Sequence, residues 1–175
     1  MEWTVIAFLF LFIWHEIEEF FVLVPWLRRN SAQLPGIAGR RSMSLAQAVF
    51  IASEELIVLI VICLWAEDVW VLAAMIAYTI HLVIHCAQMV YTYIKRFPLR
   101  LWSAPLQLPI MAWLIIAHPS QGAISLPVAS TITVAVMCMN LAFMHWFTNK
   151  VLSRSFLPMQ SGIIATNLRN QPPET

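Results

Sequence analysis

Charged residues are scarce in this sequence. Asp, Glu, Lys and Arg make up 11% of the 175 residues, whereas hydrophobic residues make up 61%, and the mean hydropathy is +0.77. A water-soluble domain of this length leaves much of its chain exposed, so it has no way to hide that much apolar surface. The formal net charge of +1 gives no sign of the clustered basic residues of a nucleic-acid-binding domain. We therefore predict one membrane-embedded domain that does not bind nucleic acid.

Cysteine is also scarce, and its three residues lie within apolar runs. The odd number argues against a disulfide scaffold, and buried free thiols usually behave as small hydrophobic groups. The sequence has no Cys-x-x-Cys motif, no Gly-rich phosphate loop and no internal repeat. The start, Met1-Glu2-Trp3, lacks the basic segment of a cleaved signal peptide. We therefore expect the first apolar run to be retained as a helix. The three cysteines are Cys63, Cys86 and Cys138.

Long apolar runs dominate the chain instead. A helix that crosses a bilayer needs about 20 apolar residues, whereas a barrel strand alternates over about half that length. The sequence thus predicts an all-α, polytopic bundle of about five transmembrane helices, at residues 3–27, 45–65, 69–94, 105–117 and 126–147. The fourth run is short and contains Pro105 and Pro109, so we expect it to be kinked or to begin in the interface. Residues 1–152 form the predicted bundle and 153–175 a polar tail.

The Lys and Arg residues indicate how this bundle is oriented. All ten lie in the first loop, in the third loop or after the last run, whereas the second loop carries Glu67 and Asp68. Because Lys and Arg concentrate in cytoplasmic loops, we expect the N-terminus outside, the C-terminus in the cytoplasm and a location in the cell (inner) membrane. The ten basic residues are Arg28, Arg29, Arg40, Arg41, Lys95, Arg96, Arg100, Lys150, Arg154 and Arg169.

Ionisable side chains nevertheless occur inside the apolar runs, where each one is costly unless it is paired or hydrated. No Lys or Arg lies within these runs to neutralise the carboxylates. A proton, an imidazolium or a bound cation must therefore do so. The residues concerned are Glu16, Glu18, Glu19, Glu54 and Glu55, with His15, His81, His85 and His145.

Helical spacing groups several of these side chains. His15, Glu18 and Glu19 are three and four residues apart and so share one face of a helix. His81 and His85 are four residues apart, which lets two imidazoles bind the same metal ion. Counted from the cytoplasmic ends at about 1.5 Å per residue, these residues lie at similar depths. We therefore predict a shared site between the midplane and the cytoplasmic third of the membrane.

Mixed imidazole and carboxylate ligands on facing helices suit iron, manganese or zinc. We predict one or two divalent or trivalent ions, with a bridging Glu when two are bound. The predicted metal ligands are His15, Glu18, Glu19, Glu54, His81 and His85. Further side chains are predicted to orient ligands, bind substrate or take part in catalysis, namely Tyr78, Gln88, Glu55, Asn140 and His145. We expect His118, beside Pro119 in an outside loop, to be solvated.

The segment His15-Glu16-Ile17-Glu18-Glu19 resembles the signature of the HXXEE family of small multi-pass membrane proteins. His15, Glu18 and Glu19 match its fixed positions. Further similarity comes from Glu54, His85 followed by Gln88, the stretch 93–98, Asn140 and His145. After Pro98 the family tends to have glycine, where this chain has Leu99. The resemblance implies a shared intramembrane site and no particular reaction.

These patterns favour a membrane-embedded metalloenzyme that acts on a lipid or another apolar small molecule. The number of carboxylates favours oxygen-dependent oxidation at iron over its close competitor, hydrolysis at zinc, in which the metal activates water. Metal-free alternatives are a proton-relay isomerase, a lipid-binding protein and a transporter, although no inverted repeat supports transport. A homo-oligomer is compatible with the sequence.

Overall fold

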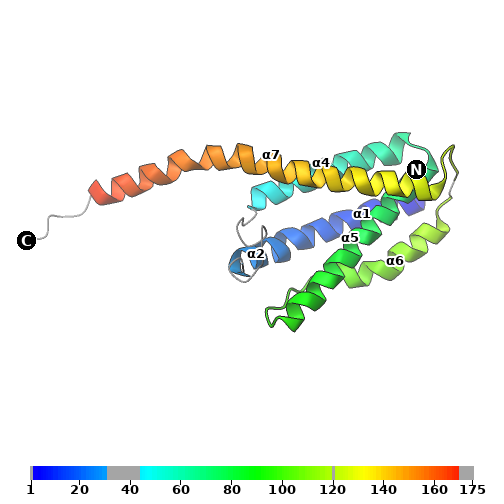
Figure 1. Ribbon diagram of the computed structural model, residues 1–175, viewed down its shortest axis with the longest axis horizontal. Helices are drawn as coiled ribbons and strands as arrows, with labels where there is room; N and C mark the ends of the chain where they lie inside the picture. Colours follow the sequence, from blue (N-terminus) through cyan, green and yellow to red (C-terminus); the bar gives the residue numbers. More distant parts are fainter. Residues whose placement is uncertain (1, 31–43, 120, 170–175) are drawn as a thin grey trace, which may run out of the picture.

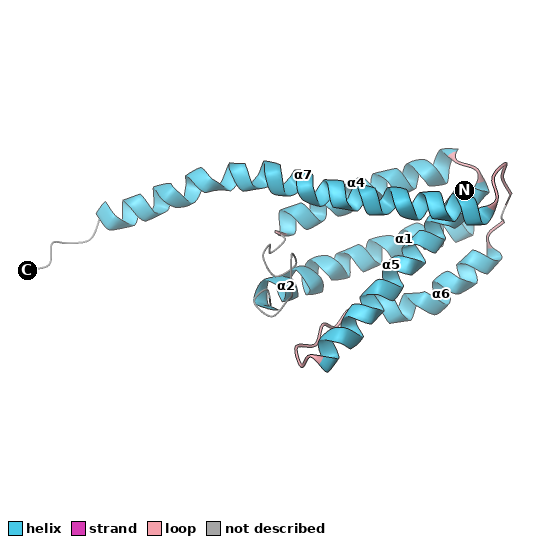
Figure 2. Ribbon diagram, in the orientation of Figure 1, coloured by secondary structure: helices cyan, strands magenta, loops and turns pink. Residues whose placement is uncertain are grey.

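The computed structural model describes residues 2–30, 44–119 and 121–169. These residues form helices and no strand (Figure 1; Figure 2), so the predicted all-α class is confirmed. The helices lie alongside one another in an elongated bundle, and one end of α7 projects well beyond it (Figure 1). The helices are α1 (Trp3–Glu18), the π-helix η1 (Glu19–Leu23), α2 (Val24–Asn30), α4 (Leu45–Trp65), α5 (Asp68–Ile94), α6 (Ser103–Ala117) and α7 (Leu126–Arg169).

Three of these helices are long and apolar enough to cross a membrane: α4, α5 and the part of α7 from Leu126 to Thr148. Only 22% of the most apolar window of α4 and 11% of that of α7 are buried within the molecule. Contiguous apolar surface of this extent is not tolerated in water, so the helices indicate a membrane protein. They correspond to three of the five predicted spans. The count of five and the orientation stay predictions.

The first predicted span forms one helical run from Trp3 to Asn30, divided by a π-helical turn. The Val24 N–H donates to the Glu19 carbonyl five residues earlier, which is the hydrogen bond that defines a π-helix. Such turns occur mostly as single bulges inside α-helices and often at functional sites. Here the turn begins at Glu19, one of the predicted metal ligands.

Helix α6 runs beside the whole of α1, from Glu18 back to Thr4. At its start, the Glu18 carboxylate accepts the backbone N–H groups of Trp102 (2.9 Å) and Ser103 (2.7 Å). Just past its end, His118 Nδ1 lies 2.9 Å from Thr4 Oγ1, and His118 is buried rather than solvated as expected. A 15-residue helix is about 22 Å long, which is shorter than a hydrocarbon core of about 30 Å. Helix α6 therefore begins at the level of Glu18, about midway along the helical run from Trp3 to Asn30, and not at one end of the bundle.

The segment between α5 and α6 is non-helical and largely exposed, but two of its leucines are buried against the bundle. Leu99 and Leu101 are 3% and 0% exposed, the Leu99 N–H donates to Thr92 Oγ1, and Trp26 Nε1 donates to the Pro98 carbonyl. Irregular backbone is tolerated at membrane depth only where protein groups satisfy it. Helix α6 contains the predicted fourth run, 105–117, and its crossing of the membrane stays a prediction.

The predicted C-terminal tail is largely helical in secondary structure. Helix α7 has 44 residues and continues to Arg169, so it passes through most of the segment 153–175. Residues 170–175 lie outside the described part of the chain. The boundary between bundle and tail stays a prediction.

The centre of the bundle is formed by α5, which packs against both α6 and α7. Tyr78, 1% exposed, donates its hydroxyl hydrogen to Gln107 Oε1 at 2.7 Å, and Gln107 Nε2 donates to the Leu11 carbonyl at 3.1 Å. Buried polar groups of this kind must be paired. The chain of hydrogen bonds therefore fixes α1, α5 and α6 relative to one another, within one helical turn of His81 on α5.

Candidate metal centre

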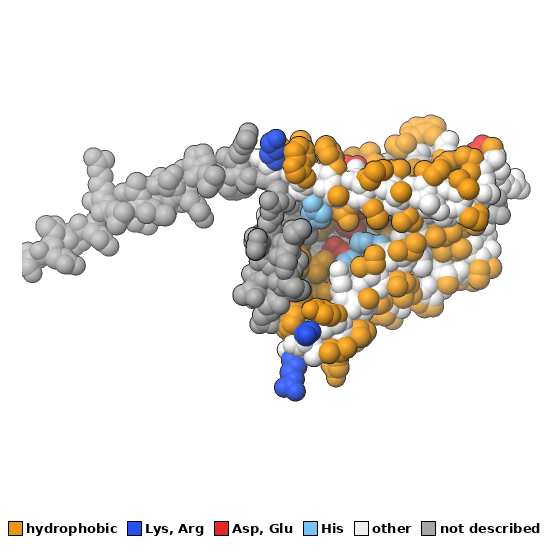
Figure 3. Space-filling model, viewed as in Figure 1, with side chains coloured by type: hydrophobic (Ala, Val, Ile, Leu, Met, Phe, Trp, Pro, Cys, Tyr) orange, Lys and Arg blue, Asp and Glu red, His pale blue; other side chains and the backbone are white. Residues whose placement is uncertain are grey.

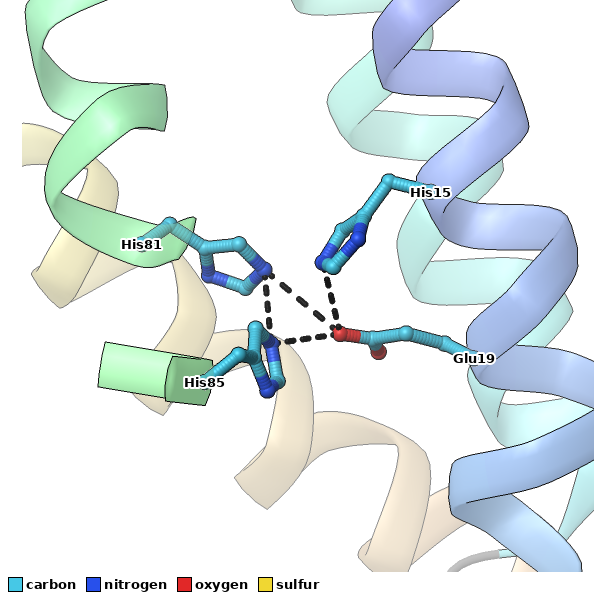
Figure 4. A group of neighbouring side chains, drawn as sticks. All are labelled: His15, Glu19, His81 and His85. Carbon is cyan, nitrogen blue, oxygen red and sulfur yellow. Dashed lines mark hydrogen bonds and ion pairs between the residues drawn. The ribbon is translucent and has the colours of Figure 1, made fainter. Parts of the chain in front are cut away.

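Four side chains from two neighbouring stretches of helix converge on one point (Figure 4). They are His15 from α1, Glu19 from the start of η1, and His81 and His85 from α5. Glu19 Oε1 lies 2.6 Å from His85 Nε2, 3.4 Å from His15 Nε2 and 3.5 Å from His81 Nε2. The Nε2 atoms of His81 and His85 are 2.9 Å apart. One ligand atom from each residue lies within 4.8 Å of the other three.

The outer nitrogens of two of these rings are held by neighbouring side chains. His15 Nδ1 lies 2.7 Å from Ser103 Oγ, and His85 Nδ1 lies 3.0 Å from Gln88 Oε1. Because an amide oxygen only accepts hydrogen bonds, the proton of the neutral His85 ring belongs on Nδ1 and its Nε2 presents a lone pair. Histidines that bind metals are oriented by partners of this kind. Both rings are therefore turned with Nε2 toward the common centre.

The centre of the cluster has an excess of lone pairs. His15 Nε2 and Glu19 Oε1 are buried, and their polar contacts among the described residues are to other atoms of the cluster rather than to a Lys, an Arg or a backbone N–H. Buried acceptors without a donor are rare because their desolvation is uncompensated. A metal ion about 2.0–2.2 Å from each ligand holds neighbouring ligands roughly 3 Å apart, close to the spacing seen here. The donor set thus fits one metal ion that binds nitrogen and oxygen.

Two of the six predicted ligands lie elsewhere. Glu18 accepts the first N–H groups of α6, as described above, and so faces α6 rather than the cluster. Glu54 Oε2 accepts a hydrogen bond from Asn140 Nδ2 at 2.8 Å, which links α4 to α7. The converging group contains a single carboxylate. Among the described residues, this group offers ligands for one ion, and a second, bridged ion stays a prediction.

The other predicted site residues take different positions around the cluster. Gln88 contacts His85, as described above, whereas the Tyr78 hydroxyl is engaged by Gln107 and only its ring approaches His15 and His81. His145 is exposed on α7. Sequence reasoning missed Ser103 and Gln107. Both lie at the start of α6, and nothing in their local sequence indicates which helix they face.

A cavity of about 110 Å³ adjoins the cluster on the side of His81, whose side chain is 35% exposed. Figure 3 shows a hollow between α7 and α5 in which His and acidic side chains are visible. The partial exposure of His81 makes one residue of the cluster accessible from outside the bundle. The lining of the cavity is mainly apolar, with carboxylates from α1 and α4. It includes Phe12, Glu16, Glu55, His81, Met137 and Cys138.

The fold and the cluster together define a class of protein: a helical membrane protein with a buried His/Glu group that is able to hold a metal ion. Residues 6–114 match the family described as "protein of unknown function with HXXEE motif", and the chain belongs to that family. Neither the curated proteins nor the solved structures gave a match.

The geometry gives each fixed residue of the motif a task. His15 and Glu19 are four residues apart and direct one ligand atom each into the cluster. Glu18, between them, accepts the N-terminal N–H groups of α6, and this brings Ser103 within hydrogen-bond distance of His15. The motif therefore both supplies the site and attaches the helix that braces it.

Proposed function

We propose that the protein binds one metal ion through His15, Glu19, His81 and His85, and that it uses this ion to oxidise an apolar molecule of the membrane with molecular oxygen. The observation that carries the proposal is the convergence of three imidazole nitrogens and one carboxylate oxygen within 4.8 Å of one another in the interior of the bundle. Because no Lys or Arg lies within the apolar runs, a bound cation would satisfy all four ligand atoms.

Coordination number favours iron over zinc for this reaction. Four protein ligands complete the tetrahedral shell of Zn²⁺ and leave no position for substrate or water, which is the mark of a structural zinc site. Iron commonly accepts six ligands, so two positions stay open. The cavity beside His81 provides room for them. Hydroxylation of a C–H bond then consumes one O₂ with two electrons and two protons from a cellular reductant, and it releases water beside the alcohol.

Zinc-dependent hydrolysis is the second candidate, and one observation favours it. Glu55 and Glu16 line the same cavity as His81, where a carboxylate that does not bind the metal is placed to act as a general base toward metal-bound water. This reaction requires one of the four cluster residues to leave the metal and open a position.

Metal analysis of the detergent-purified chain tests the proposal. We expect about one iron per chain after purification without chelators. Because each ligand contributes directly, we expect His81→Ala and His85→Ala to weaken metal binding by more than the roughly 10- to 100-fold that is typical when only an outer partner is lost. Stoichiometric zinc would favour hydrolysis, and a wild-type protein without metal would favour the proton-relay or transport alternatives.

The matched control is His118→Ala. His118 is also a buried histidine, but it follows the end of α6, about 22 Å along that helix from Ser103. We expect this variant to retain its metal even if its thermal stability falls. Equal metal loss in all three variants would contradict the proposed ligand set.

A further inference from the structure

The cavity beside His81 lies at the middle of every helix that lines it. His81 is the central residue of α5, and Glu55 is the central residue of α4. Met137 is central in the part of α7 that is apolar enough to cross a membrane. Glu16 lies at the centre of the run formed by α1, η1 and α2. Since these residues all line one cavity, the centres of four helices coincide at it, and a bilayer that these helices span would have its midplane at this level.

The midplane is the place where the ends of lipid acyl chains meet. With a hydrocarbon core of about 30 Å, the ester groups of each leaflet lie about 15 Å from it. His85 is one helical turn from His81, or about 6 Å along α5. The candidate metal centre is therefore close to chain ends and far from the polar part of a lipid.

We propose that the cavity binds the methyl-terminal part of an acyl chain of a membrane lipid and presents that part to the metal centre. The lining is mostly apolar, with Phe12, Ala77, Ile80 and Ile84 among its members. A dry cavity of about 150 Å³ holds a benzene ring, so a cavity of about 110 Å³ has room for roughly four carbon atoms. It accommodates the end of a chain, while the rest of the lipid stays in its leaflet.

This inference rests on the proposed function for the reaction and specifies which bond is oxidised, namely a C–H bond near the methyl end. It also separates the two candidate functions. To be hydrolysed, an ester would have to leave the interface and move about 15 Å into hydrocarbon, where its polar groups lose their hydration. A saturated chain end is already at this depth.

Photo-crosslinking in vesicles tests where the chain lies. Full-length protein is reconstituted in phosphatidylcholine vesicles that contain a small fraction of lipid with a diazirine either beside the carboxyl carbon or at the methyl end. After irradiation, labelled residues are mapped by mass spectrometry. Phe12 and Ala77 report the cavity, because both line it but are only 3% and 6% exposed and so are shielded from bulk lipid. We expect the methyl-end probe to label them and the carboxyl-end probe to label only helix ends.

A matched pair of variants on α7 provides the control. Met137 lines the cavity, whereas Met139 is 65% exposed on the outside of the same helix. We expect Met137→Trp to fill the cavity and lower labelling of Phe12 and Ala77 roughly tenfold, because the chain end loses its buried contacts. Met139→Trp should leave the labelling unchanged. Metal content and gel-filtration profile confirm that each variant is folded.

The same experiment distinguishes failure of the inference from failure of the proposed function. Labelling is repeated after removal of metal with a chelator, so that binding of the acyl chain is measured separately from binding of the metal. Labelling of the cavity by the methyl-end probe in a protein that binds no metal would support the inference and overturn only the proposed reaction. A metal-loaded protein whose cavity is labelled equally by the carboxyl-end probe, or by neither probe, would overturn the inference.

Discussion

Glu18 and Glu19 are adjacent carboxylates with different tasks. Neighbouring residues of a helix point about 100° apart, so Glu19 faces α5 and contacts its histidines, while Glu18 faces α6 and accepts two backbone N–H groups. The first task places the charge of the Glu19 carboxylate among the three histidines of the cluster. The second satisfies the unpaired donors at a helix N-terminus, where an acidic group also interacts favourably with the helix dipole.

The two single variants Glu18→Ala and Glu19→Ala should separate these tasks. We expect Glu18→Ala to lower the free energy of unfolding by about 1–2 kcal/mol, since an N-terminal cap is lost and two N–H groups lose their acceptor. Its metal content should stay near that of the wild type. Glu19→Ala should lose metal instead. Thermal unfolding and metal analysis of both proteins check this, and an equal metal loss in both would show that Glu18 is also a ligand.

At the scale of elements, the π-turn η1 lets one continuous helical run serve two purposes. Helix α1 and the first residue of the turn direct His15 and Glu19 toward α5. Residues after it pack on the segment that precedes α6, where the Trp26 ring stacks on Phe97 at 5.8 Å and its Nε1 donates to the Pro98 carbonyl. A regular α-helix would rotate one of these two faces away from its partner.

Deletion of Phe21 should test this role of the turn. Because a π-turn holds one residue more than an α-helical turn, removing one residue allows η1 to become α-helical while α2 keeps its rotation relative to α1. We expect the contacts of Leu23 and Trp26 to be retained, together with His15, Glu19 and the metal, so the unfolding free energy should fall by less than the roughly 2–4 kcal/mol that losing such buried contacts would cost. Thermal unfolding and metal content are the measurements.

The control for the deletion is Phe21→Ala. The Phe21 side chain is 77% exposed, so its truncation should change stability by no more than about 0.5 kcal/mol. Loss of metal in the deletion variant would contradict the expectation and would assign the bulge to the cluster itself.

At the scale of the whole molecule, the ends of the bundle differ in charge and contacts. The turn between α4 and α5 touches the loop before α7, because Val69 donates to the Gln121 carbonyl and Glu67 accepts the Ala123 N–H. At the other end lie exposed Lys and Arg side chains, seen at the left of the described bundle in Figure 3. This separation agrees with basic residues on one side of a membrane.

Cysteine accessibility should establish the orientation. In a variant whose three native cysteines are replaced by Ala, a membrane-impermeant maleimide applied to intact cells should label Ala66→Cys, between α4 and α5. It should label Lys95→Cys, at the end of α5, only after the membrane is made permeable. Both native residues are exposed, so unequal labelling reports the side of the membrane. The reverse pattern would contradict the predicted cytoplasmic location of the basic loops.

The sequence by itself determined the class of the molecule and most of its candidate site. Apolar run length predicts helices in lipid without reference to tertiary contacts, and spacing of three or four residues predicts which side chains share a face. For this reason His15 with Glu19, and His81 with His85, were predicted as pairs. The absence of Lys and Arg from the apolar runs predicted that these groups need a proton, an imidazolium or a bound cation.

Only the tertiary structure decided which faces meet. Glu18 and Glu54 satisfy the same spacing and depth rules as the four converging residues, but α6 and Asn140 occupy them. Helical periodicity fixes the direction of a side chain within its own helix and not the rotation of that helix against its neighbours, which depends on packing. The π-turn, the deep start of α6 and the position of Ser103 all arise from that packing.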